Sequence, residues 1–133
     1  MRRVVITGLG ALTPIGETID SFWDGLKNGK SGAGPITKFD TDKFKATFAC
    51  QLKEYNALDH FDRKEVRKYD PFSQYALVST DQAVKDAGLN FEELDKSRVC
   101  VLSCSGNGGI HAFQHQMTVF CEGDGTPRFT PYF

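Results

Sequence analysis

Two short apolar runs, each followed by closely spaced glycines, dominate the pattern of hydrophobic and polar positions along the chain. The first run is residues 3–7, where four consecutive residues are β-branched, and Gly8 and Gly10 follow it. The second run is residues 98–103, with glycines at positions 106, 108 and 109 after it. A short apolar run that ends at glycines is typical of a buried strand closed by a sharp turn. The pattern therefore predicts two buried strands.

Apolar residues at helical spacing predict a first helix from about residue 18 to residue 28. Thr18 suits its N-cap position, and Gly29 stands just past its expected end. The apolar positions, which include Trp23, repeat every three to four residues, as in a helix that packs one face on a core. We therefore expect Trp23 to be buried.

Two further helices are predicted on either side of Pro71. Asp62 and Glu65 have the spacing of a capping box, which predicts a short helix beginning at residue 63. Pro71 suits the first position of the next helix, with Asp70 as its N-cap, and this helix should run to residue 87 before Gly88. One stripe of this helix carries small residues that would allow another element to approach closely: Ala76, Ser79 and Ala83.

The order of these elements predicts an α/β fold. A strand, a glycine turn and a helix occur twice, with the helix 71–87 between them, which is the pattern of a βαβ unit with a parallel sheet. We also expect a strand within residues 46–53, a helix over residues 109–122, and loops over residues 29–34 and 123–127. No helix signal follows residue 127, so we expect residues 1–133 to be part of an incomplete domain.

Composition and charge are those of an ordinary globular domain and argue against several classes of binding partner. A chain of 133 residues is about the size of one domain, and 40% hydrophobic with 25% charged residues is ordinary for a globular protein. A net charge of −1 argues against nucleic-acid and membrane-surface binding. Gly8, Gly10 and Pro14 interrupt the first apolar run, so it is no signal peptide, and no run is long enough to span a bilayer. We expect a cytosolic protein.

Gly8-Leu-Gly10 begins a dinucleotide-binding fingerprint, but the sequence does not complete it. Thr13 occupies the place of the third glycine, and Pro14 follows it. No P-loop is present. A turn that packs tightly is the favoured interpretation, and a nucleotide-dependent oxidoreductase is a minor alternative.

The cysteines and histidines show no metal or nucleophile pattern. The four cysteines have neither paired metal spacing nor the density of a disulfide framework, so buried free thiols are expected: Cys50, Cys100, Cys104 and Cys121. Cys104 precedes a glycine turn but lacks the first glycine of a nucleophile elbow. His111 and His115 lie one helical turn apart without an adjacent glutamate, so we expect two polar residues on a solvated face.

The first fifteen residues after Met1 resemble the amino terminus of the β-ketoacyl-ACP synthases, the type II condensing enzymes of fatty-acid synthesis. Co-linear matches extend along the whole chain, which makes the resemblance specific. They include Phe22-Trp23, Gly29-Lys-Ser-Gly32, Phe39-Asp40, Arg63-Lys-Glu-Val-Arg-Lys-Tyr-Asp70, Gln74-Tyr75, Ser105-Gly-Asn-Gly-Gly109 and Pro127-Arg-Phe-Thr-Pro-Tyr-Phe133.

This resemblance implies a thiolase-like fold, a layered αβαβα arrangement of two similar halves, in a homodimer. Residues 1–133 would be part of the amino-terminal half. The implied reaction is decarboxylative Claisen condensation of malonyl-ACP with an acyl group held on a cysteine. The nucleophile, in an Ala-Cys-small-residue run, and two histidines would lie downstream, so the resemblance places no catalytic group here. It implies no metal and no cofactor beyond the phosphopantetheine of the carrier protein.

The resemblance also implies two binding regions. Basic residues of the Arg-Lys-x-x-Arg-Lys run would meet the acidic helix of acyl carrier protein, and those carried over are Lys64, Arg67 and Lys68. Without the family, a solvated charged helix end is an equal interpretation. Asn107 and Phe133 would belong to the acyl pocket. Asn107 replaces an apolar residue that is usual in the family, which puts a long-chain preference in doubt.

Two rival function classes remain open. One is a non-catalytic carrier-protein-binding module that uses the basic face. The other is the nucleotide-dependent oxidoreductase, against which Thr13 and Pro14 argue.

Overall fold

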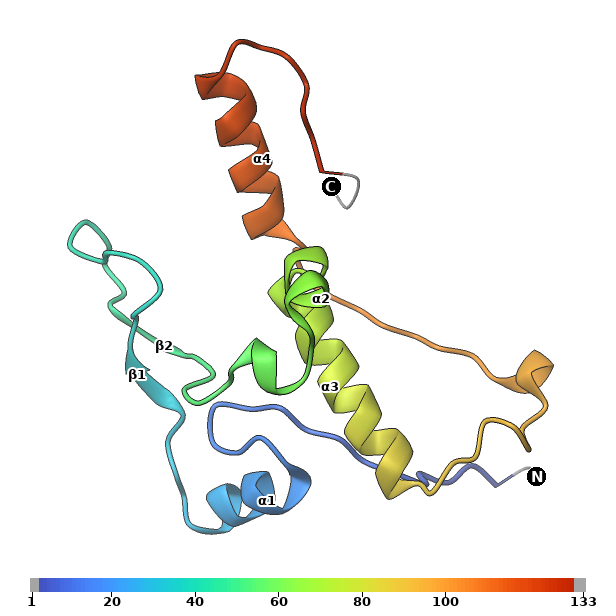
Figure 1. The fold of residues 1–133 in the computed structure, drawn as a ribbon. Helices are drawn as coiled ribbons and strands as arrows, with labels where there is room; N and C mark the ends of the chain where they lie inside the picture. The colour runs from blue at the N-terminus through green and yellow to red at the C-terminus, as the bar shows by residue number, and fades with distance from the viewer. Residues whose placement is uncertain (1–2, 131–133) are drawn as a thin grey trace. The chain divides into compact units, whose positions relative to one another are not determined.

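A computed structural model of the chain describes residues 3–130, so Phe133 lies outside the described residues. The chain divides into two compact units (Figure 1). The first comprises Met1–Tyr55 and Val78–Leu94, and the second comprises Asn56–Leu77 and Asp95–Phe133. The elements in chain order are α1 (Ile19–Lys27), β1 (Ala33–Pro35), β2 (Phe48–Cys50), η1 (Ala57–Asp59), α2 (Arg63–Lys68), α3 (Pro71–Asp86), η2 (Lys96–Arg98) and α4 (Ile110–Glu122).

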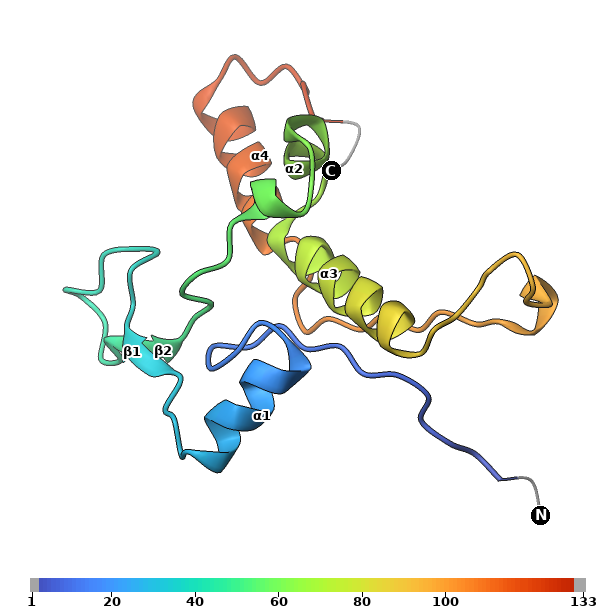
Figure 2. The ribbon, with the colours of Figure 1, turned by 60° about the horizontal axis from the view of Figure 1, so that its bottom comes forward.

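In the first unit, the amino-terminal segment lies against the second half of α3 (Figures 1 and 2). A Cβ atom on Gly8 would collide with Ala83 and Ala87, and one on Gly10 would collide with the backbone of Ser79. The glycines and the small helix residues thus allow two backbones to touch. This contact confirms the predicted tight packing.

Side chains of α3 hydrogen-bond to the backbone of this segment. The N–H of Leu9 donates to Oδ2 of Asp86 over 2.8 Å, and the N–H of Ala11 donates to Oε1 of Gln82 over 3.0 Å. Nε2 of Gln82 donates to the carbonyl of Glu17 over 2.7 Å. These bonds satisfy backbone groups of a segment that belongs to no helix or strand.

Local signals predicted α1 correctly, but the expected burial of Trp23 is wrong. Thr18 is the N-cap, Asn28 is the C-cap, and Gly29 follows with a φ of 62°. Trp23 is 58% exposed, whereas Gly25 is buried. A Cβ atom on Gly25 would lie 3.0 Å from the carbonyl oxygen of Ile15, so α1 packs through its Gly25 side. Residues two positions apart face away from each other on a helix, which leaves Trp23 on the outside.

The described residues contain one sheet, a two-stranded antiparallel hairpin. β2 lies within the strand predicted over residues 46–53. It pairs antiparallel with β1, and in this register Gly34 stands opposite Ala49. β1 was missed because its residues stand in a stretch predicted as a glycine-serine loop.

The two apolar runs form no strand in the described part of the chain, so the predicted parallel pairing is wrong for residues 3–130. Val4 is 92% exposed in the first run, and Leu102 is 89% exposed in the second. A parallel strand exists only through hydrogen bonds to a neighbouring strand. Neither run has such a neighbour within residues 3–130, so both stay extended.

The helices α2, α3 and α4 have nearly the predicted bounds. α2 begins after Asp62, α3 begins at Pro71, and α4 ends at Glu122. Gly88, which follows α3, has a φ of 60°, the left-handed value that favours glycine at a helix end. None of the helices between residues 3 and 130 has the length and apolar character that crossing a membrane requires.

The four cysteines are free, as predicted, but they are exposed rather than buried. Cys50 lies on the hairpin, Cys100 and Cys104 lie on the unpaired extended segment, and Cys121 lies on α4. Few side chains of the described chain pack against these elements, so the thiols remain exposed to solvent.

Candidate functional site

The short helix α2 is fixed at its amino end by its own sequence. Oδ1 of Asp62 accepts hydrogen bonds from the N–H groups of Lys64 (2.7 Å) and Glu65 (2.8 Å). Oε2 of Glu65 accepts from the N–H of Asp62 over 3.1 Å, which completes the predicted capping box. These bonds satisfy amide groups that the first turn of a helix leaves without partners.

The three predicted carrier-protein residues lie together on α2 and are exposed to solvent. Lys64 lies in the first turn, and Arg67 and Lys68 lie in the last, where positive charge also suits the helix dipole. Nζ of Lys68 lies 5.2 Å from the centre of the Tyr69 ring, a cation–π contact. Neither Lys64 nor Arg67 forms an ion pair within the described chain. Their charges therefore remain available to an acidic partner.

Gln74, on the first turn of α3, supports the other end of α2. Its Nε2 donates to the carbonyl of Tyr69 over 2.8 Å and to the carbonyl of Val66 over 3.4 Å. Within residues 3–130, it is the one polar side chain classed as buried, at 5% exposure. No local pattern in the sequence predicts a role for Gln74, because its bonds depend on the turn between α2 and α3.

Asp70 lies in the α2–α3 junction, directly before Pro71, the first residue of α3. It holds the predicted N-cap position, where its carbonyl accepts hydrogen bonds from the N–H groups of Ser73 (2.9 Å) and Gln74 (3.1 Å). Its side-chain Oδ2 accepts a hydrogen bond from the N–H of Ala112 over 3.2 Å. α4 starts after Gly109, which has no side chain to cap it, so a carboxylate distant in sequence takes that place.

Asn107 lies in the bend that leads into α4, and it is exposed. The bend is closed by a hydrogen bond from the N–H of Gly108 to Oγ of Ser105, at 3.1 Å, and Gly108 has a φ of 60°. Asn107 lines neither of the two cavities of residues 3–130 that are described below. The acyl-pocket role of Asn107 therefore stays a prediction, as does that of Phe133, which lies outside the described residues.

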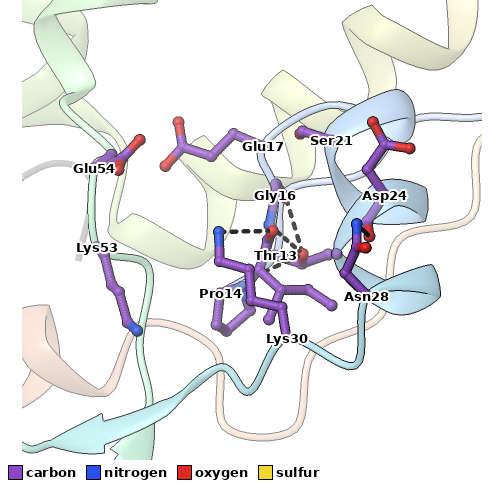
Figure 3. A pocket seen from close by; sticks show the side chains of 12 residues that line it. Thr13, Pro14, Gly16, Glu17, Ser21, Asp24, Asn28, Lys30, Lys53 and Glu54 are labelled. Carbon is purple, nitrogen blue, oxygen red and sulfur yellow. Dashed lines mark hydrogen bonds between the residues drawn. The ribbon is translucent and has the colours of Figure 1, made fainter.

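A cavity of about 450 Å³, with several charged side chains in its lining, lies in the first unit, between the loop before α1, α1 itself and the segment after β2 (Figure 3). Nζ of Lys30 donates to the carbonyl of Ile15 at its edge over 3.4 Å. The carboxylates of Glu17 and Glu54 point toward one another across the opening (Figure 3). The lining contains no cysteine or histidine, so the cavity offers no nucleophile for acyl transfer.

A second, apolar groove of about 520 Å³ follows one side of α4. Ile110, Phe113 and Met117 lie along it at helical spacing, and Phe113 is 56% exposed. The predicted histidines of this helix, His111 and His115, are both exposed, as expected of a solvated face. Within residues 3–130, no group of three or more histidine, cysteine or acidic side chains could hold a metal ion.

The loop after α4 is stabilised locally. A hydrogen bond from the backbone N–H of Thr126 lowers the pKa of Asp124. The same carboxylate forms an ion pair with Arg128, in which Nη2 of Arg128 lies 3.0 Å from Oδ2 of Asp124. Both side chains are exposed, so the pair contributes little to the stability of the fold.

Comparison with known proteins identifies a family whose members resemble this chain over nearly its whole length. The family model described as beta-ketoacyl synthase, N-terminal domain, matches residues 1–131. A 3-oxoacyl-[acyl-carrier-protein] synthase 2 from Synechocystis sp. is 39% identical over 98% of this chain, and one from Staphylococcus aureus is 40% identical over 99%. The chain spans about a third of the length of these relatives, 31% and 32%.

Solved structures of ketosynthases have the same fold. The ishigamide ketosynthase/chain length factor is 30% identical, with a TM-score of 0.82 over 98% of this chain and 32% of its own. A beta-ketoacyl synthase from Burkholderia phymatum is 27% identical, with a TM-score of 0.76 over 99% of this chain and 33% of its own. The chain has the thiolase-like α/β fold of these ketosynthases, of which it corresponds to the amino-terminal part. It belongs to the beta-ketoacyl synthase family, as an N-terminal domain sequence.

Proposed function

We propose that residues 1–133 are the amino-terminal portion of a 3-oxoacyl-ACP synthase that elongates acyl chains. The observation that carries this proposal is the match of nearly the whole chain, at about 40% identity, to relatives named 3-oxoacyl-[acyl-carrier-protein] synthase 2. The full-length protein would act as a homodimer in the cytosol.

The proposed reaction needs groups that these 133 residues do not supply. A thiolate accepts the acyl group, best at a helix amino terminus where backbone N–H groups favour negative charge. Histidine side chains then stabilise the enolate and the oxyanion. The one Ala-Cys pair here, Ala49–Cys50, lies in the β1–β2 hairpin and is followed by Gln51 rather than by a small residue. This portion would therefore contribute scaffold and partner binding.

The partner would be acyl carrier protein, and α2 its docking surface. Lys64, Arg67 and Lys68 are exposed on one short helix whose amino end is capped. Complementary surface charge steers a transient partner and fixes its orientation without a large buried interface. An acidic carrier protein that must deliver a substrate and then leave suits such a surface.

Charge reversal in the full-length synthase tests this proposal. Lys64→Glu with Arg67→Glu should raise KM for acyl-ACP by roughly ten-fold or more, because attraction becomes repulsion. KM for an acyl-pantetheine thioester should change little, and the salt dependence of the reaction with acyl-ACP should flatten.

Lys43→Glu with Lys45→Glu is the matched control. These exposed lysines of the hairpin loop change the net charge by the same amount without touching α2. Equal losses on both substrates, or equal effects of the two double variants, would contradict a docking role for α2.

A non-catalytic module that binds carrier protein through the same basic residues of α2 is the second candidate. The two candidates differ in one measurement. A module binds acyl carrier protein but forms no 3-oxoacyl-ACP in any natural form of the protein, whereas the full-length synthase forms it.

A further inference from the structure

We propose that Gln74 is a positioning residue for the carrier-protein surface: it fixes the carboxyl end of α2 and thereby the placement of Arg67 and Lys68. The inference rests on the docking role proposed for α2 and adds a residue that does not itself touch the partner. It assigns a function to the buried polar side chain of the described chain.

The geometry at the end of α2 carries the argument. The carbonyls of the last turn of a helix have no partner within the helix. The chain leaves the helix at Tyr69, which is extended (φ −99°, ψ 123°), so no further turn can cover them. Nε2 of Gln74 reaches two carbonyls at this end, that of Val66 at 3.4 Å and that of Tyr69 at 2.8 Å.

The two anchored carbonyls bracket the basic residues. Arg67 and Lys68 are the two residues between Val66 and Tyr69, so a single side chain holds the backbone on both sides of them. α2 has six residues, far fewer than a helix needs to be stable by itself in water. Its conformation therefore depends on anchors at both ends, Asp62 at the first and Gln74 at the last.

The neighbouring aromatic side chains strengthen the same end. The rings of Phe61 and Tyr69 meet edge to face at 5.9 Å, and Nζ of Lys68 lies above the Tyr69 ring. The hydrogen bond from Gln74 to the Tyr69 carbonyl fixes the residue on which Lys68 rests. Loss of this bond would leave part-buried carbonyls without their hydrogen-bond donor and free the end of the helix to move.

α3 provides a matched control. Gln82 lies on the same helix, is also a glutamine, and also bridges backbone groups, those of Ala11 and Glu17 in the first unit. Leucine at either position removes the amide at similar volume. A general cost of losing a bridging glutamine would appear in both variants, whereas an effect through α2 would appear only in Gln74→Leu.

The experiment compares Gln74→Leu and Gln82→Leu in the full-length synthase with two substrates. We expect Gln74→Leu to raise KM for acyl-ACP by about three- to ten-fold, the effect of losing one or two such bonds. The value of kcat and the KM for an acyl-pantetheine thioester should stay unchanged. Gln82→Leu should leave the ratio of the two KM values unchanged. If Gln74→Leu does not yield folded protein, Gln74→Met gives the same readout, because a thioether side chain is flexible and uncharged and has no donor.

A double-variant cycle separates this inference from the docking proposal. In an Arg67→Ala, Lys68→Ala background, Gln74→Leu should add little to KM for acyl-ACP, because residues that act as one unit are not additive. Additive effects, or equal KM changes on both substrates, would overturn the role of Gln74. If the background variant itself leaves KM for acyl-ACP unchanged, the docking role of α2 fails instead.

Discussion

Asn107 is exposed in the bend before α4, so its side chain is free to turn toward a ligand or away from it. The family resemblance leads us to expect an apolar residue at this position, and Asn107 has an amide there instead. A buried amide without a partner costs about 1–3 kcal/mol. An acyl chain that reached Asn107 would meet that cost, whereas a short acyl group would not reach it.

Replacing this residue in the full-length synthase distinguishes the two orientations. Asn107→Ile should raise kcat/KM for long acyl primers by roughly one to two decades and leave short primers nearly unchanged, since about 1.4 kcal/mol corresponds to a factor of ten. The measurement is a profile of kcat/KM against chain length. A uniform loss across all primers would mean that Asn107 holds the bend before α4 and does not select the acyl chain.

At the scale of residues, the sequence correctly predicted a close contact made by small residues, but it did not predict which side chains are buried. The small residues Ser79 and Ala83 predicted a close approach, and Gly8 and Gly10 supply it. Trp23 was expected in a core because its helix is amphipathic, yet α1 packs through Gly25. Periodicity identifies an apolar face, but it does not say which surface covers that face.

At the scale of elements, helix caps formed by residues close in sequence were predicted, whereas a cap formed by a residue distant in sequence was not. Thr18 and Asp62 were predicted as N-caps because a cap contacts amides only two or three residues away. The cap of α4 could not be predicted, since Asp70 reaches Ala112 across 42 residues. The support of α2 by Gln74 was missed for a related reason: it depends on how the chain turns between two helices.

The cap of α4 has a measurable contribution to stability. Asp70→Ala should lower the free energy of unfolding by about 0.5–2 kcal/mol, the usual cost of losing a side-chain cap. Asp70→Asn retains an acceptor oxygen and should cost clearly less. Chemical denaturation of the full-length protein provides both values, and equal losses in the two variants would show that the charge, rather than the hydrogen bond to Ala112, is what matters.

At the scale of the whole molecule, strand formation depends on contacts between segments that are distant in sequence, and local patterns do not predict such contacts. The strand signals at residues 3–7 and 98–103 are genuine apolar runs, but a strand also needs a neighbour, and none lies within residues 3–130. The hairpin formed because its partners, β1 and β2, are close in sequence. Family resemblance predicted the fold class correctly, since the co-linear matches carry information about long-range contacts that periodicity lacks.

The 133-residue chain made alone should have no condensing activity. It lacks the Ala-Cys-small-residue run, and the cavity between α1 and the segment after β2 has no thiol or imidazole in its lining. Purified chain incubated with acyl-ACP and malonyl-ACP should form no 3-oxoacyl-ACP above background. Product formation by this chain would overturn the family-based assignment of the catalytic groups.

The contact between the amino-terminal segment and α3 also determines how the first unit opens. The amides of Leu9 and Ala11 bond to side chains 77 and 71 residues away, while Val4 and Ile6 are 92% and 82% exposed. Hydrogen–deuterium exchange at Leu9 and Ala11 therefore requires these long-range bonds to break. Their amides should exchange together with those in the second half of α3, and more slowly than those of residues 4–6. The beginning of the chain and the end of this helix would then unfold as one cooperative unit.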